Sequence, residues 1–139
     1  MNETLAFHIV SLYKDFLEYT KLRLKEIGLN FGQMPVILYI GKHPNCTQSS
    51  LTKELSLDWG YSQRCIQKLC DTLFIEKSFL KEKNCNRLTL TAKGDEAFEI
   101  CHSVFSSWDA IKMQDFTFSE QNDLLSLIAK ISAEKEGKN

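Results

Sequence analysis

Residues 47–94 constrain the fold of this chain more than any other segment, because they predict two short helices in close succession. In 59–74 the apolar residues recur at the i, i+3, i+4 spacing of a helix that packs one stripe on a core. A shorter helix is predicted over 48–55. Thr47 and Asp58 precede the two segments and are typical N-caps, since their side chains can accept hydrogen bonds from first-turn amides. The pattern predicts a helix-turn-helix.

A basic strand pair is predicted directly after the second helix. Phe79 and Leu80 lie in a lysine-rich strand candidate, Asn84-Cys85-Asn86 has the composition of a turn, and 87–91 alternates with the period of a strand. Leu90-Thr91-Ala92-Lys93-Gly94 then leads into another helix. A helix-turn-helix with such a wing can place a helix in a DNA groove and a basic arm on the neighbouring backbone, so DNA binding is the leading hypothesis.

Apolar-periodic segments predict helices on both sides of this unit. They cover about 5–27, ended by Gly28; 31–41, with Pro35 in its first turn; 92–111, capped by Thr91; and a last helix behind the capping box Thr117-Phe118-Ser119-Glu120. The first and last are more apolar than a small core needs, which predicts an interface with a second subunit; packing on each other within a monomer is the alternative. The expected fold is mainly α with a small β-hairpin wing, a winged helix-turn-helix with long terminal dimerisation helices.

Length and motifs exclude several classes of protein. A chain of 139 residues suits one domain. It has no run of roughly 20 apolar residues and no leader pattern, so we expect a cytoplasmic protein without a membrane partner. Five cysteines without a CxxC pair and three scattered histidines predict reduced thiols and no metal site. Without a glycine-rich phosphate loop, GxSxG or HExxH, neither an enzyme nor a cofactor is expected.

The charge is divided unevenly along the chain. The formal net charge is −1, yet residues 48–93 hold eight Lys/Arg against five Asp/Glu, whereas 94–139 hold four against nine. Residues 77–93 include five basic residues and a single acidic residue, Glu82. Because local charge decides where a phosphate backbone is attracted, the winged segment is compatible with DNA despite the acidic total. A solvated hairpin surface is the alternative interpretation of the same charges.

The second predicted helix presents a polar face opposite its apolar stripe. Arg64 is suited to a bidentate contact with guanine, Gln63 or Gln67 to one with adenine, and a lysine to phosphate. Candidate DNA-binding residues come from the start of the first short helix, the second helix and the wing: Gln48, Ser49, Tyr61, Ser62, Gln63, Arg64, Gln67, Lys68, Lys83 and Arg87.

Three segments in this order resemble the MarR family of bacterial transcriptional regulators: Thr47-Gln48-Ser49-Ser50-Leu51, Ile66-Gln67-Lys68-Leu69-Cys70-Asp71-Thr72-Leu73 and Leu90-Thr91-Ala92-Lys93-Gly94. The resemblance spans nearly the whole chain. It implies a homodimer whose recognition helices enter successive major grooves of double-stranded DNA at an inverted repeat. Residues 1–139 then form one domain, with a dimerisation region in 1–30 and 92–139 and a winged helix-turn-helix lobe in 31–91.

The resemblance also implies a ligand-responsive repressor. A small apolar or phenolic effector between the dimer helices and the DNA-binding lobe would favour a spacing of the recognition helices that does not match the operator. The aromatic residues available to line such a site, which core packing explains equally well, are Phe7, Tyr13, Phe16, Phe31, Tyr39 and Trp59.

Two positions depart from the family pattern. The family usually has a glycine a few residues after the recognition helix, where this chain has Phe74-Ile75-Glu76-Lys77-Ser78. Its wing usually carries Asp-x-Arg about eight residues before the Leu-Thr pair, where this chain has Glu82-Lys83-Asn84. The wing arginine is therefore missing, and Lys83 or Arg87 is the candidate substitute.

Two alternative functions stay open at this point. One is a redox-responsive regulator that uses Cys85 or Cys65, the cysteines predicted to be exposed. The other is a helical protein-interaction module without DNA binding. Salt-dependent binding to duplex DNA distinguishes the latter from a DNA-binding regulator.

Overall fold

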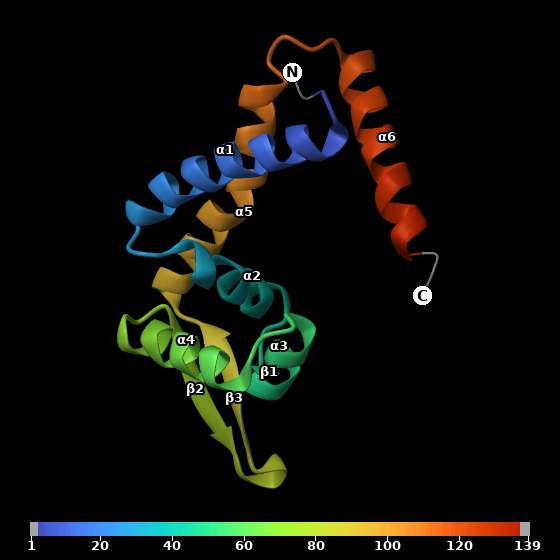
Figure 1. Cartoon of the computed structure of the whole chain (residues 1–139). Helices are drawn as coiled ribbons and strands as arrows, with labels where there is room; N and C mark the ends of the chain where they lie inside the picture. Colours follow the sequence, from blue (N-terminus) through green and yellow to red (C-terminus); the bar gives the residue numbers. More distant parts are fainter. Residues whose placement is uncertain (1–2, 137–139) are drawn as a thin grey trace. The chain divides into compact units, whose positions relative to one another are not determined.

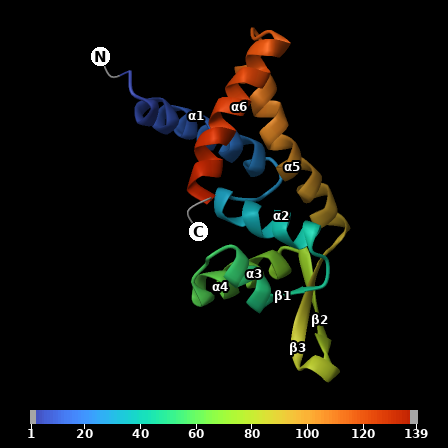
Figure 2. The same cartoon turned by 90° about the vertical axis from the view of Figure 1, so that its right-hand side faces the viewer.

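The computed structural model describes residues 3–136, with side chains as far as residue 132, and is mainly helical (Figures 1 and 2). Its elements are α1 (Leu5–Lys25), the 3-10 helix η1 (Phe31–Gln33), α2 (Met34–Lys42), β1 (Cys46–Thr47), α3 (Gln48–Glu54), α4 (Trp59–Asp71), β2 (Ile75–Leu80), the 3-10 helix η2 (Lys81–Lys83), β3 (Cys85–Leu90), α5 (Ala92–Lys112) and α6 (Phe118–Glu136). By compactness the chain divides inside α5 into residues up to Phe105 and residues from Ser106.

Helix starts follow the predicted caps. The Thr47 hydroxyl accepts from the Ser50 amide, and the Asp58 carboxylate accepts from the Tyr61 amide, each at 3.1 Å. Thr91 caps α5 by accepting from the Gly94 amide at 3.0 Å. The capping box at Thr117 is also confirmed, since Thr117 and Glu120 each satisfy the other's backbone amide.

The predicted second helix begins differently from expectation. The segment starts as η1, closed by a reciprocal pair of 2.9 Å hydrogen bonds between Asn30 and Gln33, and only then continues as α2. Pro35 lies in the first turn of α2, as predicted. Its missing amide hydrogen has no acceptor there in any case, so the helix tolerates it.

The sheet has three strands, whereas the sequence predicted two. β3 lies in the middle, with β2 and the short β1 antiparallel on either side. β1 was missed because it has only two residues, Cys46 and Thr47, paired with Leu88 and Arg87. The hairpin turn was also misplaced: the tip is η2 with Asn84 in a left-handed conformation, while Cys85 and Asn86 already belong to β3.

One apolar core joins the helices of the winged lobe to the sheet. Ile37 and Ile40 of α2, Ile66 of α4 and Leu88 of β3 are fully buried within it. Leu24 at the end of α1 and Cys101 of α5 belong to the same cluster, so these two long helices are anchored to the lobe. The hairpin of β2 and β3 extends beyond the helices as a wing (Figures 1 and 2).

The long helices also expose large apolar side chains. On α1 these include Leu5, Ile9, Leu12 and Tyr13, each about half exposed. In the unit that begins at Ser106, α6 exposes a second set: Phe118, Leu124, Leu125, Leu127, Ile128 and Ile131. A monomer rarely leaves so much apolar surface uncovered. In the part of the chain that the structure describes, no helix combines the length and apolar character needed to cross a membrane.

Candidate DNA interface

Helix α4 presents a continuous polar face to solvent. Its apolar residues Ile66 and Leu69 are fully buried, which turns the opposite side outward. The exposed side chains on that side are Tyr61, Gln63, Arg64, Gln67 and Lys68. They are hydrogen-bonding or basic groups, and the B-form major groove is wide enough to admit the helix that carries them.

The prediction for Ser62 is wrong, because its side chain points into the lobe. Ser62 is fully buried, and its hydroxyl lies 2.6 Å from that of Thr52 on α3. The Thr52 hydroxyl also donates to the Gln48 carbonyl oxygen at 2.7 Å. This hydrogen-bonded pair fixes α3 against the first turn of α4 and leaves no Ser62 atom for DNA.

The two candidates on α3 differ in exposure. Ser49 is exposed in the first turn of the helix. Gln48 is half-buried, and its Nε2 is buried without a hydrogen-bond partner among the described residues. A buried amide without a partner loses its hydration without compensation, so the Gln48 side chain would have to turn outward to meet an acceptor on DNA.

The wing places its basic residues at two levels. Lys81 and Lys83 are exposed at the tip, within η2. Arg87 lies instead at the base, paired with Thr47 and Ser78, and its Nη1 donates to the Asn45 carbonyl oxygen at 2.7 Å. Arg87 therefore holds the turn before β1. The lysines at the tip are better placed to contact the phosphate backbone of DNA.

The turn from α4 into the wing keeps the geometry that a glycine usually provides. Leu73 adopts a left-handed conformation with φ +67°, and the Phe74 amide donates to the Leu69 carbonyl oxygen at 2.9 Å. These features define a Schellman-type helix end. The left-handed position that suits a glycine is thus Leu73, one residue before the 74–78 segment considered in the sequence, and the leucine strains a turn that still closes.

Residues 91–94 tie α5 to the end of α4. The Thr91 hydroxyl donates to the Leu73 carbonyl oxygen at 2.6 Å, and Lys93 Nζ donates to the Thr72 carbonyl oxygen at 2.8 Å. The Lys93 ammonium also lies 4.3 Å from the centre of the Phe74 ring. A cation at the carboxyl end of a helix is favoured by the helix dipole, so Lys93 stabilises the end of α4 from another helix.

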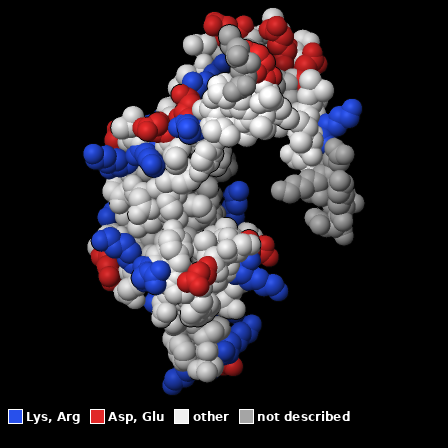
Figure 3. All heavy atoms as spheres, in the orientation of Figure 1, with Lys and Arg blue, Asp and Glu red and all other residues white. Residues whose placement is uncertain are grey.

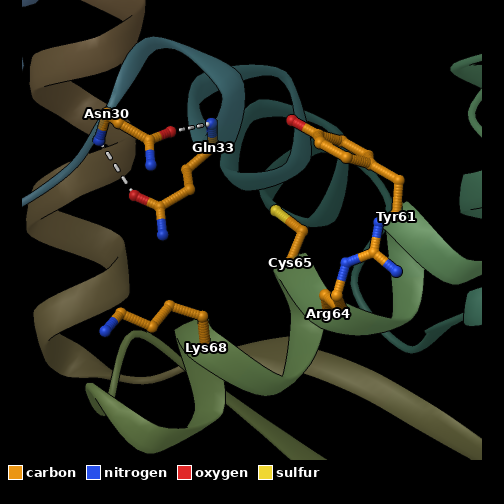
Figure 4. Close-up of a pocket in the computed structure, with 6 residues that line it drawn as sticks. All are labelled: Asn30, Gln33, Tyr61, Arg64, Cys65 and Lys68. Atoms are coloured by element: carbon orange, nitrogen blue, oxygen red, sulfur yellow. Dashed lines mark hydrogen bonds between the residues drawn. The ribbon is translucent and has the colours of Figure 1, made fainter.

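A small open pocket of about 200 Å³ borders the exposed face of α4 (Figure 4). Arg64, Cys65 and Lys68 line it from α4, opposite Asn30 and Gln33, and Tyr61 closes one end. Sequence reasoning missed Asn30 and Gln33, because nothing in the sequence brings this turn beside the recognition helix.

Burial raises the pKa of four of the five cysteine thiols. Cys65 is buried, which corrects its predicted exposure, and burial raises the pKa of its thiol. Burial likewise raises the pKa of Cys46 and Cys70, and that of Cys101 to about 11. Cys85 is half-buried in the wing. Among the residues that the structure describes, no group of His, Cys, Asp and Glu is arranged to hold a metal ion.

Figure 3 shows basic side chains at several places on the lobe and at the tip of the wing, with acidic side chains among them. The described Lys and Arg side chains of α4 and the wing are exposed except Arg87, which is half-buried. Lys77 and Lys81 belong to the basic stretch that the sequence indicated, but they were not chosen as candidate DNA-binding residues, because a charge run does not show which of its members face outward.

Curated relatives identify the family. The chain is 34% identical over 137 residues to the HTH-type transcriptional regulator BilQ of Clostridium symbiosum, covering 98% of this chain and 95% of the relative. It is 30% identical over 126 residues to BilQ of Clostridioides difficile, covering 88% of this chain and 84% of the relative. No family model matches the sequence.

Solved structures show the same fold. MarR superposes with a TM-score of 0.78 at 21% identity, covering 100% of this chain and 99% of its own. A MarR family regulator from Listeria monocytogenes, solved in complex with a 26mer DNA, gives 0.73 at 23% identity over 96% and 89% of the two chains. The fold, the exposed recognition helix with its wing and the relatives at 34% and 30% identity agree. The chain belongs to the MarR family of winged helix-turn-helix transcriptional regulators, proteins that bind DNA and are not enzymes.

Proposed function

We propose that this regulator is a homodimeric, ligand-responsive repressor that binds a short inverted repeat. The observation that carries DNA recognition is the exposed face of α4, with Arg64, Gln63 and Gln67 able to reach base edges beside a basic wing. Lys68 and Lys83 are assigned to phosphates. The regulator acts in the cytoplasm, where the DNA is.

The homodimer follows from the uncovered apolar side chains. Leu12 on α1 is 48% exposed and Ile128 on α6 is 42% exposed, each within a larger exposed apolar set on its own helix. A second copy of the chain would cover such surfaces and hold two recognition helices for two half-sites about one helical turn apart. A charge at Leu12 (L12E) is expected to shift the protein toward monomers, as measured by light scattering.

Ligand response is assigned to the junction between α5 and the turn that follows α4. A pocket of about 210 Å³ is lined by Ile27, Phe74, Lys93, Glu96, Ala97 and Ile100. Its apolar walls and the Lys93 ammonium suit a small apolar or phenolic molecule. A ligand that draws Lys93 toward itself would release the Thr72 carbonyl oxygen at the end of α4, and so bias the position of the recognition helix.

Duplex selection tests the proposal. Purified protein is incubated with random duplexes, and the bound sequences are expected to show a twofold-symmetric consensus. Arg64→Ala should lose discrimination at one base pair of each half-site, by about 1–3 kcal/mol. Lys83→Ala should instead weaken all duplexes alike and lower the salt slope by about one per site. Unchanged affinity in both variants refutes the assignment of α4 and the wing.

A further inference from the structure

An aromatic side chain lies exposed near the tip of the basic wing. Ile75, Lys77 and Phe79 alternate along one face of β2, opposite Leu90, Leu88 and Asn86 on β3. At the inner end of this face Ile75 and Leu88 are buried against the helices. At the outer end Phe79 is 57% exposed, because the wing has passed beyond the helices there.

The surroundings of Phe79 show what kind of partner fits it. Lys77 lies two residues before it on the same face, and the exposed Lys81 and Lys83 follow at the tip. A protein partner would need an acidic surface around an apolar contact. A groove of DNA matches both features, because its phosphates pair with the lysines while the sugars and base edges between them offer apolar contact.

We propose that Phe79 acts as an apolar wedge of the wing against the minor groove of DNA beside each half-site. The inference rests on the proposed binding of α4 in the major groove, since the groove next to a major groove is a minor one. The minor groove, about 6 Å wide, excludes a helix but admits the edge of a phenyl ring. Aromatic and aliphatic wedges are used in this way by proteins that contact the minor groove.

The wedge has a consequence for sequence preference. A G·C pair places the N2 amino group of guanine on the floor of the minor groove, whereas an A·T pair has only acceptors there. A phenyl ring over that amino group would remove its water without supplying an acceptor. Phe79 is therefore expected to favour A·T pairs beneath the wing, although it forms no hydrogen bond to them.

Inosine separates this effect from other causes of A·T preference. An I·C pair presents the major-groove groups of G·C and lacks the N2 amino group in the minor groove. The probes are duplexes recovered by selection from random sequences, rebuilt with A·T, G·C or I·C pairs beneath the wing. The wild-type protein is expected to bind the A·T and I·C forms alike and the G·C form about fivefold to tenfold more weakly, the size of one aromatic contact to a base.

Substitutions at the wing complete the test. Phe79→Ala is expected to weaken binding to the A·T form by about tenfold and to remove its advantage over G·C, with an unchanged salt slope because no charge is lost. Phe79→Leu keeps an apolar wedge and should keep much of the preference. Lys81→Ala is the matched control, expected to lower the salt slope by about one per site and to leave the A·T to G·C ratio unchanged.

The outcomes distinguish this inference from the function on which it rests. If the wild type binds the selected duplexes but Phe79→Ala binds every form equally well, the wedge is refuted while DNA recognition by α4 stands. The same holds if Phe79→Ala changes only self-association. If the wild type binds no duplex, the proposed function fails together with the wedge.

Discussion

Replacing Gly94 by alanine is expected to destabilise the protein, because a backbone carbonyl occupies the space of the new methyl group. A Cβ at position 94 would lie 2.0 Å from the Phe74 carbonyl oxygen and 3.1 Å from Leu90 Cβ. Rotation of a side chain cannot relieve the first contact, because the backbone of residue 94 fixes the position of its Cβ and the other atom is a backbone oxygen. The start of α5 must therefore move away from the turn after α4, by about 1 Å, to restore an allowed contact.

This movement acts on two hydrogen bonds that Thr91 donates to the turn after α4. The Thr91 amide donates to the Phe74 oxygen at 3.0 Å, and the Thr91 hydroxyl donates to the Leu73 oxygen at 2.6 Å. Overpacking costs about 1–3 kcal/mol, and two weakened hydrogen bonds cost about 1 kcal/mol each. Alanine recovers about 1 kcal/mol of helix propensity. The net loss of unfolding free energy for Gly94→Ala is therefore about 2–4 kcal/mol.

Thermal and urea unfolding measure this loss. For a chain of this size 2–4 kcal/mol corresponds to a decrease in Tm of roughly 8–16 °C. All variants are compared at one protein concentration, because an oligomer gains stability with concentration. Gly60→Ala is the matched control: its Cβ would meet only the ends of Asp58 and Arg64, at 3.2 and 3.3 Å. We expect it to be neutral or stabilising, and a Gly94→Ala protein within about 0.5 kcal/mol of wild type refutes the steric argument.

Three further substitutions test other parts of the structure. Leu73→Gly should raise the unfolding free energy by about 0.5–1 kcal/mol in urea titrations, because glycine adopts the left-handed φ of +67° without strain and the leucine is 68% exposed; a loss of stability contradicts this. Ser62→Ala should cost about 0.5–1.5 kcal/mol by the same assay, since Thr52 keeps its bond to Gln48 and no hydroxyl is left unpaired; a loss above 3 kcal/mol rules out this account. Burial raises the pKa of Cys101 from 9.0 to about 11, so the unfolded thiol ionises first and stability falls as pH rises from 9 to 11. Between pH 8 and 10 the unfolding free energy of Cys101→Ala should fall less than that of the wild type. Equal falls in the two proteins exclude Cys101 as a cause of the pH dependence.

The sequence predicted every long helix and the order of the winged unit, because caps and apolar spacing act locally. Asp58 and Thr91 begin their helices as expected. The strand β1 has only two residues and is held by pairing with β3 across about 40 positions of sequence, so no local pattern marks it. The hairpin tip was misplaced for a related reason: Asn84-Cys85-Asn86 has turn composition, but the register of β2 with β3 places Cys85 opposite Leu80.

The sequence predicted which face of α4 is exposed, but it did not predict the orientation of every candidate residue. Arg64, Gln67 and Lys68 lie on the exposed side of α4, as the helical wheel required. Ser62 lies four residues before Ile66 and seven before Leu69, so helical spacing itself places it on the buried stripe, and counting it with the exposed face was an error of position. The Thr52 hydroxyl on α3 gives the buried serine its hydrogen-bond partner, a tertiary contact that no local pattern shows.

The two ends of α4 are held by different parts of the chain, which bears on how a ligand could change DNA binding. Near its start, Ser62 bonds to Thr52 of α3, within the helix-turn-helix itself. At its other end, Thr91 and Lys93 bond to the carbonyl oxygens of Leu73 and Thr72 across the junction with α5. A displacement of α5 therefore acts first on the carboxyl end of α4, while α3 holds its start. If α4 pivots about its first turn in this way, a small movement at Lys93 is expected to change the angle that Arg64 and Gln67 present to a DNA groove.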